Sequence, residues 1–287
     1  MEVKPISIDR HPRRSLRKTH DIPIRKFDFP IKREGDYAFP DRPAESHFLH
    51  ILSLFFPEGE RFFVDSVMNY RDQIKDEKLR QQIRGFAGQE AQHAKQHAKY
   101  NDRIAKPRIR TDWLDPVQDV LFKLARKLPK KVQLAATVGA EHFTALLADK
   151  VLRHPEIVKG SNPDHQALWM WHAAEETEHK AVAFDVYRAI GGGYVIRVAT
   201  MTALSTALVP GIAGMMIYFM AADEKLFSFK DWRSFGQWAF GEGGMFSDFV
   251  GPFVAFYRPG FHPWQQDNSA LLEKWKGLQG NQTSAQA

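Results

Sequence analysis

The sequence predicts an all-α fold built around a four-helix bundle, and three observations support this prediction. Apolar residues recur at helical spacing along most of the chain, and strand-like alternation is scarce. Two Glu-x-x-His motifs, at residues 90–93 and 176–179, each place a carboxylate and an imidazole about one helical turn apart. An isolated glutamate in an apolar stretch precedes each motif, Glu60 by 30 residues and Glu141 by 35. Two helical hairpins would bring these groups to one level, as in bundles that hold two metal ions.

Residues 1–42 are expected to form an extended basic arm over the surface. They are rich in Pro, Arg and Asp and lack helical periodicity. Such an arm can bind nucleic acid or an anionic membrane surface. A solvated tail without a nucleic-acid partner is favoured, because no nucleic-acid-binding module follows. No apolar stretch follows the arm, so a secretory signal peptide is not expected. The basic residues crowded here contribute to the net charge of +6, and they are Arg10, Arg13, Arg14, Arg17 and Lys18.

The bundle domain is expected to span residues 43–192. Pro57 marks a kink site in its first helix, Asp76 is a good N-cap for the second, and Pro129 opens the third. Three consecutive glycines, residues 191–193, end the fourth. The predicted core helices cover residues 44–73, 76–104, 129–152 and 163–190, with a connector helix at 116–128.

A helical extension, residues 193–287, is expected to pack on the bundle. Residues 198–222 carry no charge and are long enough to span a bilayer as a helix. Hydroxylated residues dilute the hydrophobicity of this segment, and Pro210 predicts a break within it. A buried hairpin or an element lying on the membrane surface is therefore favoured over a spanning helix. The aromatic-rich tail beyond it is expected to cover the bundle.

The chain has 287 residues, is 44% hydrophobic and contains no cysteine. It can therefore bury a large core, whereas disulfides, thiolate metal sites and cysteine nucleophiles are excluded. These features fit a cytoplasmic protein, with membrane association through residues 198–222 left open.

The second predicted helix carries three candidate functional residues on one inward face. Glu90, His93 and His97 lie within about 60° of one another at 100° per residue. A buried glutamate is rare unless it is paired or bound to metal. We therefore expect Glu90 and His93 to be metal ligands, and His97 to support a ligand or contact substrate.

The fourth predicted helix adds a second histidine-rich set. His172 and His179 share one helical direction, and Glu175 and Glu176 lie about equally far to either side of it. Glu176 completes the Glu-x-x-His spacing, so we expect His172, Glu176 and His179 to be ligands. Glu175 is expected either to support them or to lie on the surface. Glu178 is expected to point to solvent.

The other two core helices supply one glutamate each. Glu60 shares an apolar stripe on the first helix, whereas Glu58 lies nearer Arg61 and is expected to be exposed. On the third helix, Glu141 is flanked by small residues that leave room for a metal or substrate. The expected metal ligands are thus Glu60, Glu90, His93, Glu141, His172, Glu176 and His179.

Mixed carboxylate and imidazole donors suit iron or manganese, and we expect two Fe ions, with Mn as the alternative at either position. With these motifs the chain resembles the ferritin-like di-iron carboxylate superfamily, and within it the bacterial family of predicted metal-dependent hydrolases. That resemblance covers roughly residues 39–264. The spacing of residues 172–179 is also similar to that of the p-aminobenzoate N-oxygenase group, which implies the extra histidine as a ligand.

The favoured function is a di-iron oxidase or oxygenase that uses O₂ to oxidise a small, hydrophobic organic substrate. It would need an external electron donor, because nothing in the sequence resembles a flavin or nicotinamide site. The alternative is a metal-dependent hydrolase whose dinuclear site activates water. Iron storage or a purely structural polar core is a third reading, and a homodimer is a further expectation.

Overall fold

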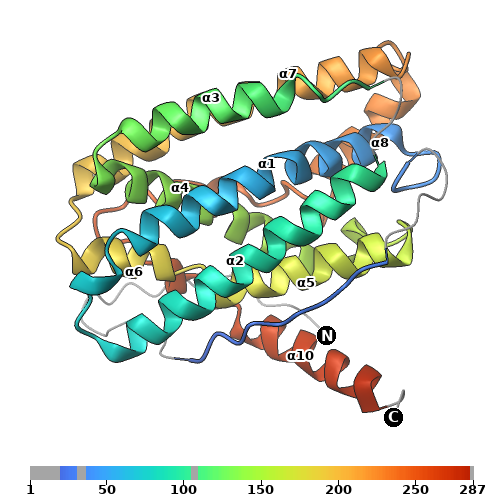
Figure 1. The fold of residues 1–287 in the computed structure, drawn as a ribbon. Coiled ribbons are helices and arrows are strands. Elements are labelled where there is room, and N and C mark those ends of the chain that lie inside the picture. The colour runs from blue at the N-terminus through green and yellow to red at the C-terminus, as the bar shows by residue number, and fades with distance from the viewer. Residues whose placement is uncertain (1–19, 31–36, 105–108, 285–287) are drawn as a thin grey trace.

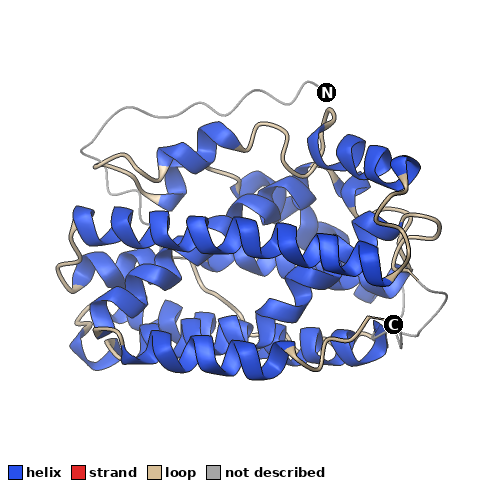
Figure 2. Ribbon diagram, turned by 90° about the horizontal axis from the view of Figure 1, so that it is seen from above, coloured by secondary structure: helices blue, strands red, loops and turns tan. Residues whose placement is uncertain are grey.

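A computed structural model of the chain describes residues 20–30, 37–104 and 109–284. The described residues are helical and contain no β-strand (Figures 1 and 2), which confirms the predicted all-α class. The basic cluster predicted at residues 10–18 lies outside the described residues.

Four helices surround the predicted metal site: α1 (Pro43–Met68), α2 (Glu77–Ile104), α4 (Lys130–Arg153) and α5 (Pro163–His179). α1 packs along α2 and α4 packs along α5, so the chain forms the two predicted hairpins. α3 (Leu114–Lys127) connects them. α1 runs through Pro57 without interruption, which shows that packing on α2 overrides the local preference for a break.

The predicted fourth helix is divided in two. It ends at His179, and α6 (Val182–Ala189) begins after a turn at residues 180–181. The Lys180 ammonium donates to the carbonyl oxygen of Gln266 and to Oδ1 of Asn268, 2.7 Å away in each case. This anchoring to the C-terminal region holds the backbone turn in place, and the helical periodicity of residues 163–190 does not reveal it.

The apolar segment forms one helix, α7 (Tyr194–Ala222), which continues through Pro210. The predicted break is absent because buried residues anchor the helix on both sides of the proline, Met201 on one side and Phe219 on the other. α7 packs against α4 and α1 on the outside of the bundle (Figure 1) and is largely exposed, so it is not the buried hairpin that was one expectation. Within the described chain it is the one helix long and apolar enough to cross a membrane.

The aromatic tail covers the bundle, as predicted. The rings of Phe235, Trp238 and Phe246 lie around that of Phe48 on α1 at 5.6–5.9 Å between centroids. The elements of this region are α8 (Phe229–Phe240), α9 (Val250–Ala255) and α10 (Ser269–Ser284).

Residues 20–30, called the strap below, follow the seam between α2 and α5 (dark blue in Figure 1). Amides from α2 fix its backbone: Gln89 Nε2 donates to the carbonyl of Pro23 and Gln96 Nε2 to that of Phe27. A Cβ atom built on Gly85 would lie 2.4 Å from the carbonyl oxygen of Ile22, so the strap reaches this depth only because residue 85 has no side chain.

Candidate metal centre

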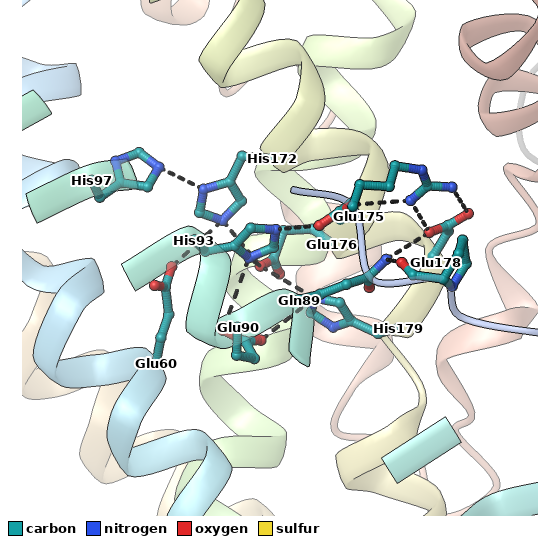
Figure 3. A network of polar contacts seen from close by, with 12 residues as sticks. Glu60, Gln89, Glu90, His93, His97, His172, Glu175, Glu176, Glu178 and His179 are labelled. Carbon is teal, nitrogen blue, oxygen red and sulfur yellow. Dashed lines mark hydrogen bonds and ion pairs between the residues drawn. The ribbon is translucent and has the colours of Figure 1, made fainter. Parts of the chain in front are cut away.

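Carboxylates and imidazoles from α1, α2 and α5 converge inside the bundle (Figure 3), and Glu141 of α4 contacts His179 among them. Every expected ligand is buried, with 5% or less of its surface exposed. α1 contributes Glu60, α2 contributes Glu90 and His93, α4 contributes Glu141, and α5 contributes His172, Glu176 and His179.

Two overlapping groups of side chains have the spacing that a metal ion requires. The donor atoms of Glu90, His93, Glu176 and His179 lie within 4.8 Å of one another, as do those of Glu60, His93 and His172. His93 belongs to both groups, and Glu176 Oε1 lies 3.6 Å from its Nδ1 atom and 3.0 Å from His172 Nε2. The two groups are thus contiguous within one cluster.

Glu141 lies at one side of this arrangement. Its Oε2 atom is 3.2 Å from Nδ1 of His179, while its Oε1 atom has no hydrogen-bond partner. The His179 Nε2 atom faces Glu90 Oε1 at 3.4 Å. Glu141 therefore contacts the cluster through His179, and it belongs to neither of the two groups of donor atoms.

The unpaired donor atoms show that the centre fits a metal. Buried polar atoms in proteins are almost always hydrogen-bonded, so each exception calls for an explanation. Eight atoms of the expected ligands have no hydrogen-bond partner. They are both carboxylate oxygens of Glu60 and of Glu90, Oε1 of Glu141, Oε2 of Glu176, Nδ1 of His93 and Nε2 of His179. A pair of divalent cations would satisfy them together.

Without metal, three of the four carboxyl groups of the centre favour protons. Burial, and then the charges of neighbouring carboxylates, raise the pKa values of Glu60 and Glu90 well above the usual range. Burial is also the main cause that raises the pKa of Glu141 to about 7. Burial acts in the same sense on Glu176, but the His179 and His172 rings outweigh it and lower its pKa.

The histidines divide into two classes. Burial lowers the pKa values of His93 and His97 well below the usual range, so both rings are neutral. Burial also opposes the charge of His179, yet the carboxylates of Glu176 and Glu141 raise its pKa to about 9. A cation bound here would displace protons from the carboxyl groups and from His179.

A second layer of charge supports His93. Its Nε2 atom lies 3.0 Å from Oε2 of Glu175, so the protonated Nε2 donates to this carboxylate and the Nδ1 lone pair faces the centre. Arg25 of the strap donates to Glu175 at 2.9 Å and to both oxygens of Glu178, at 2.7 and 2.8 Å. The sequence thus predicted the supporting role of Glu175, but it gave no signal for Arg25.

Glu178 contradicts its prediction. Its side chain is fully buried rather than solvated. Besides Arg25, Gln89 donates to it at 2.8 Å and Lys276 of α10 lies 3.1 Å away. Helical angle alone assigned it to the surface, because the strap and α10 that cover this face of α5 are remote in sequence.

His97 lies behind His172 rather than among the donor atoms of the two groups. Its Nε2 atom is 2.7 Å from Nδ1 of His172, and its Nδ1 atom is 2.8 Å from Oγ of Ser53. The Phe56 ring covers both imidazoles, with centroids 4.7 Å from each. Of the two roles expected for His97, this geometry matches the support of a ligand.

The described residues thus form a buried carboxylate and imidazole centre with space for two cations. The family described as predicted metal-dependent hydrolase matches residues 23–267, which include the strap from Pro23 onward and all the expected ligands. No curated protein and no solved structure matches the chain.

Proposed function

The chain belongs to the predicted metal-dependent hydrolase family, and we propose that it is a hydrolase that activates water at a dinuclear metal centre. The observation that supports this most is the set of unpaired donor atoms from four helices around one buried point. The sequence alone favoured an oxygenase, but the family match favours the hydrolase alternative over that prediction.

In this proposal the residues of the centre have distinct roles as metal ligands and as supports of those ligands. Glu60, Glu90, Glu176 and the three histidines would hold two cations, with Glu141 beside His179. Two divalent cations bound here would polarise a substrate oxygen and acidify water. Their carboxylate-rich donor set suits iron or manganese. Glu175 and Arg25 keep the Nδ1 lone pair of His93 directed into the centre, while Phe56 and the bundle core exclude bulk solvent.

A metal-loading assay with matched variants tests this proposal. Glu90→Ala and Glu176→Ala should each lose bound metal, together with metal-dependent turnover of chromogenic esters or phosphoesters under anaerobic conditions. Glu58→Ala is the control, because Glu58 is only two residues from Glu60 but pairs with Arg61 at 2.6 Å on the surface. Full metal loading of both centre variants would refute the site assignment.

A dioxygen-using enzyme is the second candidate, and the presence of His172 as an additional imidazole in the donor set favours it. It would act on a small hydrophobic substrate and draw on an external electron donor. Ferrous-loaded protein exposed to O₂ distinguishes the two candidates. Rapid iron oxidation with a transient visible absorption, together with no anaerobic turnover of any ester, would favour the oxidase.

We also propose that the chain associates with membrane surfaces through α7. The exposed face of this helix carries no charge between Arg197 and Asp223. The hydroxyl groups of Thr202 and Thr206 donate to carbonyl oxygens one turn back, so they do not depend on water. These features suit a helix that lies in the plane of a bilayer interface.

A further inference from the structure

A chain of buried side chains leads from α1 and α2 to the metal centre. Ser53 Oγ donates to Oδ1 of Asn101 at 2.6 Å and lies 2.8 Å from Nδ1 of His97. His97 Nε2 lies 2.7 Å from Nδ1 of His172, whose Nε2 atom faces the centre. Ser53 and His97 are fully buried, and 3% of His172 is exposed.

The direction of every hydrogen bond in this series of side chains can be assigned by starting from Asn101. The Nδ2 group of Asn101 donates to the backbone carbonyl of Ser53 at 3.0 Å. A carbonyl oxygen can only accept, so this bond fixes the amide and leaves its Oδ1 atom facing the Ser53 hydroxyl. Ser53 has a single proton, and it donates that proton to Oδ1. The hydroxyl oxygen must then accept a hydrogen bond from Nδ1 of His97.

The same argument assigns the protons on the imidazoles of His97 and His172. The neutral ring of His97 carries its proton on Nδ1, so its Nε2 atom accepts from Nδ1 of His172. Because Nδ1 of His172 carries the donated proton, Nε2 is the atom through which this ring would bind a metal ion. It faces two carboxylate oxygens, Glu176 Oε1 at 3.0 Å and Glu60 Oε1 at 3.8 Å. A cation held by Glu60, His93 and His172 would take the Nε2 lone pair as a ligand.

We propose that Asn101, Ser53 and His97 are positioning residues that fix the tautomer of His172 and thereby set the affinity of the metal position between Glu60 and His172. The support of His172 is uncharged, whereas His93 is supported by the carboxylate of Glu175 and by Arg25. The two histidines therefore differ in their supporting charge, and His172 belongs to only one of the two donor groups. The inference rests on the metal centre of the proposed function, but not on the reaction that the centre performs.

Cobalt(II) titration of the full chain, followed by visible absorption and equilibrium dialysis, tests the inference. Ser53→Ala and His97→Phe should weaken one of two cobalt equivalents about 10- to 100-fold and leave the other unchanged, as is typical when support of a ligating histidine is lost. Ser53→Thr keeps the hydroxyl and should keep both affinities. Ser66→Ala is the matched control, because its buried hydroxyl on the same helix pairs with Thr137 at 2.7 Å.

A spectroscopic readout separates positioning from general damage to the fold. In the cobalt-loaded protein the Nδ1 proton of His172 should give a hyperfine-shifted, slowly exchanging signal. This signal should exchange faster with solvent in Ser53→Ala but not in Ser66→Ala.

Three results would overturn the inference. The first is wild-type affinity for both equivalents in Ser53→Ala and His97→Phe. The second is an equal loss in Ser66→Ala, and the third is a wild-type chain that binds no cobalt, which would also refute the proposed function. Two intact cobalt sites with no hydrolysis would refute the proposed reaction and leave this inference standing.

Discussion

Arg25 should contribute more to stability than any other charge of the strap, and Arg25→Ala measures that contribution. Its side chain is 20% exposed, whereas those of its two partners, Glu175 and Glu178, are fully buried. Removing one member of a buried ion pair costs about 3–5 kcal/mol, because the other charge is left without compensation. Glu178 keeps Gln89 and Lys276 after the substitution, so the lower end applies, about 3 kcal/mol.

The loss should depend on pH in a definite direction. Burial raises the pKa of Glu175 to about 7 even with Arg25 in place, and removing Arg25 raises it further. At pH 5 this carboxyl is protonated in both proteins, so its share of the loss is small. As pH rises through 7, the wild-type carboxylate ionises beside Arg25 while the variant must bury a charge or retain a proton. The deficit of Arg25→Ala should therefore grow from pH 5 to pH 8.

Urea denaturation of the metal-free protein at pH 5 and pH 8 measures both effects. A loss of about 3 kcal/mol corresponds to a drop in melting temperature of roughly 6 °C for a chain of this size. Lys26→Ala removes the same charge from an exposed neighbour and should change the unfolding free energy by less than about 0.5 kcal/mol. If the two variants were equally stable at pH 8, the assignment of Arg25 as the charge partner of these carboxylates would be wrong.

Three further predictions follow from the same structure. Gly85→Ala should displace the strap and lower the free energy of unfolding by about 1–3 kcal/mol, the usual cost of overpacking. Gly214→Ala should not destabilise the protein, because a Cβ atom added there meets no other atom, and urea denaturation curves compare the two variants. Metal binding at pH 7 should release at least two protons per chain, because His179, with a pKa near 9, Glu141, near 7, and the raised carboxyls of Glu60 and Glu90 must give up protons. Affinity should therefore rise with pH, and calorimetry in buffers of different ionisation enthalpy would contradict this if no proton were released. Val195→Glu on the exposed face of α7 should reduce flotation with anionic vesicles several-fold, and equal flotation of variant and wild type would argue against α7 as the contact.

The sequence predicted the parts of the fold that depend on short-range periodicity. The all-α class, the two hairpins and the proximity of Glu60, Glu141 and the two Glu-x-x-His motifs agree with the helical spacing, since residues three, four and seven apart share a face. The resemblance to predicted metal-dependent hydrolases was confirmed by the family match. The preference for an oxygenase came from the additional histidine, His172, and the resemblance that it carries, which do not determine the reaction.

The parts that could not be predicted depend on contacts distant in sequence. Arg25 lies 150 residues from Glu175, and no local pattern marks it as a partner. Glu178 was assigned to solvent because the segments that bury it come from both ends of the chain. Ser53 is an ordinary small residue in an apolar helix, and its importance becomes visible only when the side chains of Asn101 and His97 are placed beside it.

The position of the strap links completion of the centre to the order in which the chain is synthesised. Arg25 leaves the ribosome some 150 residues before its partners on α5, and Lys276 of α10 follows later still. Until α5 has emerged, the strap has no seam to occupy, and until α10 has emerged, Glu178 lacks one of its cations. The layer that orients His93 is therefore assembled only after α5 has been synthesised. A nascent chain would not hold this ligand in place before the bundle that encloses it has closed.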